Sequence, residues 1–284
     1  MRDNITQLST FTNAVTEATA AGGTTPAEYD RILQAWRDFA ETTNTATGPV
    51  DELAEAVIEG APEDRVRDLM TCAYALDVDP MKRATVAQTV AGRVLAALRE
   101  SYETVAADNY ETARKAFDTT ATRFAKALDT IDPDTPSDQL LTATAAQRSA
   151  WAEIPPLADE LDTRLLALAA TARLAGTDST PDGLLAFAVT PGEKDDRRAI
   201  WQAWEDDTPR GGRWTALART GQKITAPALA DWQHYRRPAP LETHTVAVGN
   251  GQYVNVTIDP EKGEDPATVA QAERSRRRAA LVSA

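Results

Sequence analysis

The longest helical signal in this chain is PMKRATVAQTVAGRVLAALRESYETVAADNYETARKAFDTTATRFAKALDTI, residues 80–131. After Pro80 no proline interrupts it, and apolar or small residues recur about every 3.75 residues. This spacing is above the roughly 3.5 residues of a left-handed coiled coil and nearer the roughly 3.67 of a straight or slightly right-handed one. One helix of this length would extend for about 80 Å, at roughly 1.5 Å per residue. The recurring positions are Val86, Val90, Val94, Leu98, Tyr102, Val105, Asn109, Ala113, Phe117, Ala121, Phe124, Leu128 and Ile131.

The weakest point of this signal is AADN, residues 106–109. Asp108 or Asn109 could cap a second helix here, because their short polar side chains accept hydrogen bonds from free N–H groups. We expect one long helix and keep two helices as the alternative.

Helix starts of one kind recur along the chain, each with a small or capping residue followed by proline. Proline fits the first helical turn because the N–H that it lacks would have no partner there. Alanine is the most frequent residue, with 53 copies, and aromatic residues make up only 6%. These features predict a mainly α protein, an elongated helical bundle. The starts lie at Pro26, Pro49, Pro62, Pro80, Pro181 and Pro266.

The segment DPDTPSD, residues 132–138, should end the long helix, and we expect two more helices at about 137–153 and 155–175. Turn residues then gather in GTDSTPDG, residues 176–183, and in TPGE from residue 190. The sequence therefore predicts an acidic helical bundle over 1–178 and a smaller α+β region over 190–284.

Charge and tryptophan content distinguish the two regions. Residues 1–190 carry 30 acidic and 16 basic side chains, whereas residues 191–284 carry 13 and 14. Repulsion from phosphates makes nucleic acid an unlikely ligand of residues 1–178. Four of the six tryptophans fall within the second region, and we interpret them as its core, with an interface patch as the alternative. They are Trp201, Trp204, Trp214 and Trp232.

A β-hairpin is predicted in the second region at THTVAVGNGQYVNVTI, residues 243–258. A two-residue Asn250-Gly251 turn would pair apolar with polar side chains, whereas a three-residue loop with a left-handed Gly251 pairs Val246 with Val254. The second register places five apolar side chains on one face: Val246, Val248, Val254, Val256 and Ile258. The other face then carries Thr243, Thr245, Ala247, Tyr253, Asn255 and Thr257.

A lone two-stranded hairpin is marginally stable in water, so its apolar face must be covered. The chain's own helices could cover it, and we expect the tryptophan-containing ones to do so. The strand edges would still offer unpaired backbone groups to a neighbouring subunit or partner. The predicted interface comprises Val246, Val248, Tyr253, Val254, Val256 and Ile258.

A basic helix is predicted at 266–282, containing RSRRR at residues 274–278. Its arginines could dock on the acidic bundle of the same or an adjacent subunit, which we favour, or contact phosphates. The predicted docking residues are Arg236, Arg237, Arg274, Arg276, Arg277 and Arg278.

The sequence provides no recognisable catalytic or metal site. With one cysteine and two histidines, one chain can build neither a disulfide framework nor a Cys/His zinc cage. We expect Cys72 in the core and structural roles for His234 and His244. The acidic runs Glu205–Asp207 and 132–138 are expected to be solvated turns, because the second lacks the glycine and glutamate of a calcium loop.

These features favour a soluble, cytoplasmic, non-enzymatic structural or assembly protein with no cofactor, since no stretch reads as a signal peptide or a membrane span. Its partner would be a second copy or another structural protein. The excess of arginine over lysine, 24 to 6, is typical of high-GC genomes and suggests a minor phage virion component or an assembly adaptor. The alternatives are a DNA-associated module using the basic helix, or an enzyme with an unfamiliar site around His234 with Glu205 or Asp231.

Overall fold

The computed structural model describes residues 3–45, 49–76, 80–177, 181–190, 196–247 and 252–282. It is 69% helical with a single β-hairpin in this described part, which confirms the mainly α fold class. The chain divides into two compact units. The first is Met1–Thr190 with Lys223–His234, and the second is Pro191–Gln222 with Tyr235–Ala284. Lys223–His234 thus belong to the first unit, whereas the sequence predicts one continuous α+β region over 190–284.

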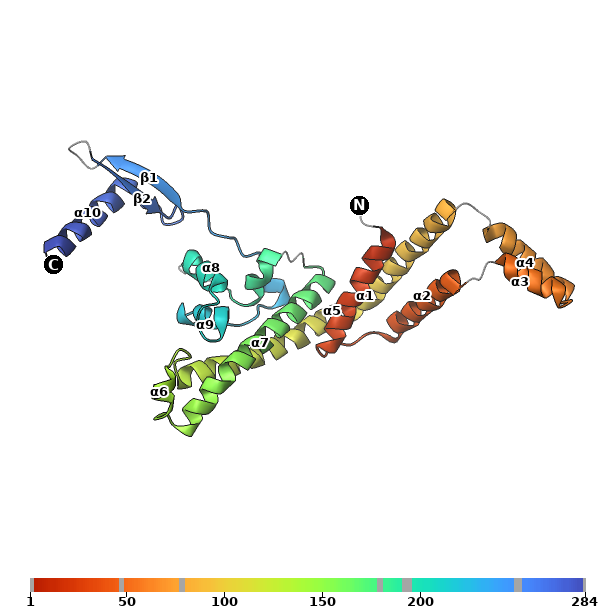
Figure 1. Ribbon diagram of the computed structural model, residues 1–284, viewed down its shortest axis with the longest axis horizontal. Coiled ribbons are helices and arrows are strands. Elements are labelled where there is room, and N and C mark those ends of the chain that lie inside the picture. Colours follow the sequence, from red (N-terminus) through yellow and green to blue (C-terminus); the bar gives the residue numbers. More distant parts are fainter. Residues whose placement is uncertain are drawn as a thin grey trace. The chain divides into compact units, whose positions relative to one another are not determined.

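The first unit is helical (Figure 1). Its elements are α1 (Asn4–Ala20), α2 (Ala27–Thr45), α3 (Pro49–Ile58), α4 (Glu63–Leu76), α5 (Pro80–Thr130), α6 (Ser137–Leu140), α7 (Ala145–Leu174), and the 3-10 helices η1 (Pro181–Phe187) and η2 (Leu229–Asp231). The start at Pro181 thus gives a 3-10 helix. The second unit contains α8 (Arg197–Glu205), α9 (Gly212–Arg219), β1 (Glu242–Ala247), β2 (Tyr253–Ile258) and α10 (Pro266–Val282).

Helix α5 is continuous over 51 residues, as the prediction of one long helix required. It packs along α7, and the two helices run side by side in Figure 1. Val86, the first position of the expected periodic series, is 58% exposed, so the buried face begins farther along the helix. Its buried positions are Ala91, Leu95, Leu98, Tyr102, Ala106, Asn109, Tyr110, Ala113, Phe117, Thr120, Ala121, Phe124 and Ala127.

Asn109 does not cap a second helix. It is 4% exposed, accepts a hydrogen bond from the Thr24 N–H at 2.8 Å, and donates to the Thr24 carbonyl at 2.9 Å and the Tyr102 hydroxyl at 2.8 Å. The connection between α1 and α2 therefore lies directly on the middle of α5. A Cβ on Gly23 would come within 2.9 Å of the Ala18 carbonyl oxygen, so this approach requires glycine.

Helix α7 continues through Pro155 and Pro156, and the prediction of two helices at 137–153 and 155–175 is wrong. Each proline removes a backbone hydrogen bond, which normally ends or kinks a helix. Here buried side chains continue on both sides of the prolines and pack this region of α7 against α5, so tertiary burial offsets the loss. They include Ile154, Leu157, Leu161, Leu165 and Leu168.

Helices α1 and α2 complete the core of the first unit by packing on α5. The backbone N–H of Asn4 donates to the Gln88 side chain, and its side-chain amide donates to the Gln88 carbonyl, which fixes the start of α1. The shared core consists of Leu8, Val15, Tyr29, Ala91, Leu95, Leu98, Tyr102 and Ala106, with Phe11, Ile32, Leu33 and Trp36 packed against it.

Residues 223–234 return to α5 as a strap. The Thr225 hydroxyl and the Ala226 N–H both donate to Asp118 Oδ1, at 3.1 and 2.9 Å. The Tyr110 hydroxyl donates to the Pro227 carbonyl at 2.8 Å. Trp232 stacks on Phe187, with ring centroids 5.3 Å apart. Trp232 therefore packs within the first unit, whereas the sequence grouped it with the three tryptophans of the second unit.

Those three tryptophans lie in α8 and α9 of the second unit. Trp214 is 1% exposed and packs edge-on against Trp204, with centroids 5.7 Å apart. Trp201 stacks on Tyr235 at 5.8 Å. The structure thus gives these side chains the packing role that the sequence favoured.

The hairpin has the predicted register, with Val246 opposite Val254 and His244 opposite Val256. Val248 and Gly251, and with them the predicted loop and bulge, lie outside the described residues. The expectation that tryptophan-containing helices cover the apolar face is wrong. Val256, Ile258 and Ala270 of α10 form a core, with Val246, Val254 and Val269 packed against it. Helix α10 follows β2 closely in the chain, so this cover forms locally.

Candidate interaction surfaces

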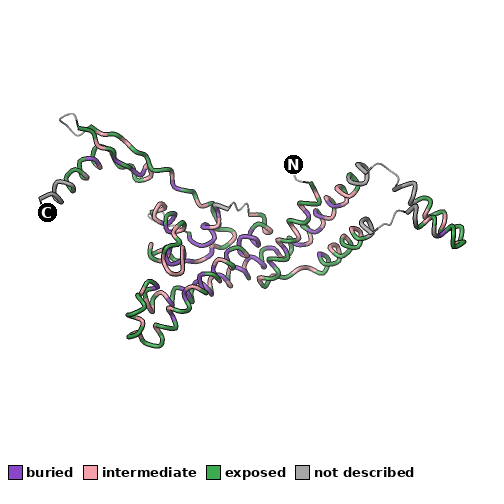
Figure 2. The backbone as a smooth tube through the Cα atoms, viewed as in Figure 1, coloured by how far each residue is buried: buried purple, intermediate pink, exposed green. Residues whose placement is uncertain are grey.

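The two faces of the hairpin differ in exposure, and along β1 and β2 exposed residues alternate with less exposed ones (Figure 2). On the inner face Val256 is 1% exposed and Ile258 7% exposed. Of the predicted interface, Val246, Val254, Val256 and Ile258 lie on this covered face, and Tyr253 lies on the other, 70% exposed. All six described residues of the outer face are exposed: Thr243, Thr245, Ala247, Tyr253, Asn255 and Thr257.

The strand edges are the second feature of the hairpin. Over the described ranges β1 and β2 pair only with each other, so the sheet has two strands and two edges. In an antiparallel pair, alternate residues direct their N–H and C=O groups away from the partner strand. Such an edge can accept a further strand. One polar cross-strand pair, Thr245 Oγ1 to Asn255 Oδ1 at 2.8 Å, lies on the outer face.

A cluster of ion pairs, here called the clasp, joins the start of α8 to the segment after β2. The Arg198 guanidinium donates to both carboxylate oxygens of Asp259, at 2.6 and 2.7 Å, and to the Ala239 carbonyl. Lys262 pairs with Asp196 at 2.9 Å. Arg197 pairs with Glu261 at 3.4 Å, completing the clasp. Because only 8% of the Asp259 side chain is exposed, the Arg198 pair is the least solvated of these contacts.

The clasp changes the acidity of its carboxyl groups. The Arg198 hydrogen bonds, helped by the Glu261 backbone N–H, lower the pKa of Asp259 to about 2. The hydrogen bond from Lys262 and the backbone N–H of Ala199 lower the pKa of Asp196. Both carboxylates are thus stabilised in the charged form that the clasp requires.

We expect Asp259→Asn to lower the melting temperature at neutral pH, with the difference from the parent disappearing as the pH falls from about 4 to about 2. The folded-state pKa of Asp259 lies below its ordinary value of 3.8, so its stabilisation is present above that value and is lost on protonation. Thermal unfolding followed by tryptophan fluorescence measures this. Asp207→Asn, at an exposed residue of the same unit, is the control. A difference that persists unchanged to pH 2 would contradict this role of Asp259.

The basic residues predicted to dock have two kinds of environment. Arg237 lies over the Trp201 ring at 5.0 Å and pairs with Glu205 at 3.6 Å, so it is engaged within the second unit. Arg236 is exposed. In α10 the described side chains beyond Ala270, including Arg274 and Arg276, are exposed. The side chains of Arg277 and Arg278 lie outside the described residues.

Helices α3 and α4 pack on each other and form a short acidic pair, here called the acidic hairpin. Among its described side chains only Ala56 is buried, whereas Val57 is 59%, Ile58 83% and Met70 44% exposed. In Figure 2 the exposed colour dominates both helices. Isolated helices of 10 and 14 residues have little stability without tertiary packing. Burial of these exposed apolar side chains against a partner would therefore stabilise the acidic hairpin.

The residues considered for chemistry do not form a cluster in the described chain. His234 is exposed and contacts the Trp232 ring edge-on at 4.5 Å, without a hydrogen bond to any described carboxylate. His244 lies 3.0 Å from Glu242 on the same strand. Asp206 bonds to Thr208 within its own turn, and Asp231 is exposed. The Cys72 side chain lies outside the described residues.

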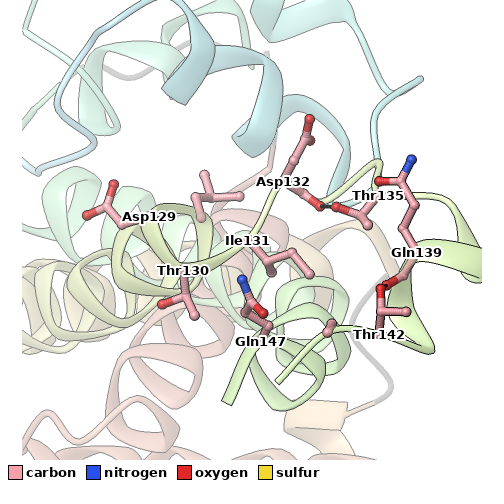
Figure 3. Close-up of a pocket in the computed structure, with 10 residues that line it drawn as sticks. Asp129, Thr130, Ile131, Asp132, Thr135, Gln139, Thr142 and Gln147 are labelled. Carbon is pink, nitrogen blue, oxygen red and sulfur yellow. Dashed lines mark hydrogen bonds between the residues drawn. The ribbon is translucent and has the colours of Figure 1, made fainter. Parts of the chain in front are cut away.

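Sequence reasoning missed one hollow, of about 590 Å³, where α5 ends and α7 begins (Figure 3). None of its lining side chains is buried, and Asp132 accepts a hydrogen bond from the Asp134 N–H within the same turn. Within the described chain no group of three or more potential metal ligands occurs, here or elsewhere. The lining residues are Leu128, Asp129, Thr130, Ile131, Asp132, Thr135, Gln139, Thr142, Ala143 and Gln147.

Within the described ranges, none of the helices combines the length and apolar character needed to cross a bilayer. Comparisons with protein-family models, with curated proteins and with solved structures found no match to this chain. Its class is therefore defined by the fold alone: a mainly α protein with a small α+β unit.

Proposed function

We propose that this protein is a non-enzymatic structural or assembly protein that associates with a second copy by pairing an edge strand of its β1–β2 hairpin. The observation that carries this proposal is the exposed sheet edge. Helix α10 covers one face of the hairpin, and no strand in the described part of the chain pairs with either edge. A role in a phage particle, or as an assembly adaptor for another structural protein, belongs to the same proposal.

Pairing of edge strands suits this hairpin better than stacking of its apolar inner face on a partner. Since Val256 and Ile258 are already buried against Ala270, the hairpin has little apolar area left to offer. Backbone hydrogen bonding between strands needs no such area, and the alternating side chains then set the register. Thr245, Asn255 and Tyr253 would provide cross-strand contacts on the outer face.

We expect register-specific cross-linking when single cysteines are placed along one strand in a Cys72→Ala background. The β1 variants are Thr243→Cys, Thr245→Cys and Ala247→Cys, and the β2 variants are Tyr253→Cys, Asn255→Cys and Thr257→Cys. Symmetric antiparallel pairing brings one position close to its own copy or, in a mixture of two of these variants, to one other position, within the roughly 4.4–6.8 Å between Cα atoms that a disulfide allows. Oxidised dimer on a non-reducing gel measures it.

The control is Leu141→Cys, at a residue that is 82% exposed and lies in the first unit. Dimer yield should peak at one position of a strand, or at one mixture of two positions, and fall on both sides. If no hairpin variant and no such mixture yields more dimer than the Leu141 variant, symmetric strand pairing between copies is ruled out.

A further inference from the structure

We infer that the basic half of α10 in one copy docks on the acidic hairpin α3–α4 of a second copy, giving a head-to-tail contact in addition to strand pairing. This inference rests on the proposed function in that it needs two copies of the chain. Because the contact joins two different surfaces, a copy that has used one of them can still bind a further copy through the other and so extend an assembly.

Charge complementarity selects the two surfaces. Residues 49–76, which span α3 and α4, contain seven acidic and two basic residues, and α10 contains four arginines and one glutamate. Arg67 of α4 is paired with Glu63 and Asp64 of its own helix. Glu52, Glu59 and Asp68 are exposed and pair with no cation among the described residues. These three carboxylates are available to the arginines of another chain.

The exposed apolar side chains of the acidic hairpin also favour binding of a partner. Val57, Ile58 and Met70 are exposed on the acidic hairpin, and covering them would bury further apolar area on α3 and α4. Among the described side chains of α10, Val269 and Ala270 in its first turns pack against the strands. The described side chains from Gln271 to Arg276 are exposed.

The test uses two full-length charge-reversed variants. The donor variant carries Arg274→Glu and Arg276→Glu, and the acceptor variant carries Glu52→Lys and Asp68→Lys. Each should weaken the head-to-tail contact at least about tenfold, because the substituted positions then face charges of the same sign. By light scattering, the wild-type chain should form species larger than a dimer that shrink at high salt. Each variant alone should not exceed the hairpin-paired dimer.

An equimolar mixture of the donor and acceptor variants should restore the larger species, because opposite charges then meet at the substituted positions wherever one variant contacts the other. This rescue also shows that neither variant is misfolded. Glu100→Lys with Glu103→Lys, at exposed positions of α5, changes the net charge as the acceptor variant does; it is the control for that variant and should assemble like the wild type.

If both variants assemble like the wild type, or the mixture fails to restore the larger species, the head-to-tail contact is overturned while strand pairing can still stand. Salt-sensitive DNA retention that the donor variant loses, with assembly unchanged, would instead assign the arginines to phosphate binding. A wild-type chain that stays monomeric would overturn both this contact and the proposed function.

Discussion

Replacing Phe117 with alanine is expected to destabilise the first unit by about 3–5 kcal/mol, since a buried aromatic side chain loses its burial and leaves a cavity. Phe117 is fully buried and lies in the part of α5 that packs along α7. Removing its ring withdraws packing from the contact between the two longest helices. Urea unfolding followed by far-ultraviolet circular dichroism measures the effect.

The matched control for Phe117→Ala is Leu166→Ala on α7. Leu166 is 60% exposed, so its truncation should change the free energy of unfolding by no more than about 0.5 kcal/mol. Equal effects of the two substitutions would show that α5 and α7 do not share a core.

Asn109→Ala is expected to cost about 2–4 kcal/mol. The substitution leaves the N–H and C=O of Thr24 and the Tyr102 hydroxyl without their partner, and buried polar groups without partners are destabilising by about 1–3 kcal/mol each when water cannot replace the bond. Hydrogen exchange of the Thr24 amide should also rise, because the bond that protects it is absent.

The adjacent residue provides the control for Asn109→Ala. Asp108 is exposed, so Asp108→Ala should change the free energy of unfolding by less than about 0.5 kcal/mol. If the Asp108 variant were the less stable of the two, AADN would be acting as the helix cap that the sequence offered as an alternative.

The long helix could be predicted because its apolar spacing and its lack of internal proline both depend on local sequence. The same local signals placed most proline-headed helix starts correctly. They failed at Pro155 and Pro156, where local preference opposes a helix and packing of α7 on α5 maintains it. The role of Asn109 could not be predicted from local sequence either, because tertiary structure brings its partners Thr24 and Tyr102 together.

The hairpin register was predictable because only one pairing places the valines on one face. The element that covers that face was not predictable, since both the tryptophan-containing helices and α10 carry apolar side chains that could pack against it. The clasp was also missed: Arg198 and Asp259 are 61 residues apart, and neither stands out within its local sequence. The exposed apolar residues of α3 and α4 give no local signal, because amphipathic helices have the same pattern whether their partner is in the chain or outside it.

The most direct test of the central claim is the native mass of the full chain, measured by light scattering over a wide concentration range. An assembly protein should show a mass that rises with concentration to multiples of 30.7 kDa. Placing charges on the outer face of the hairpin, in a Thr245→Lys/Tyr253→Lys variant, should abolish strand-paired dimers. A mass of 30.7 kDa at every concentration, in the wild type and the variant alike, would contradict the proposed function.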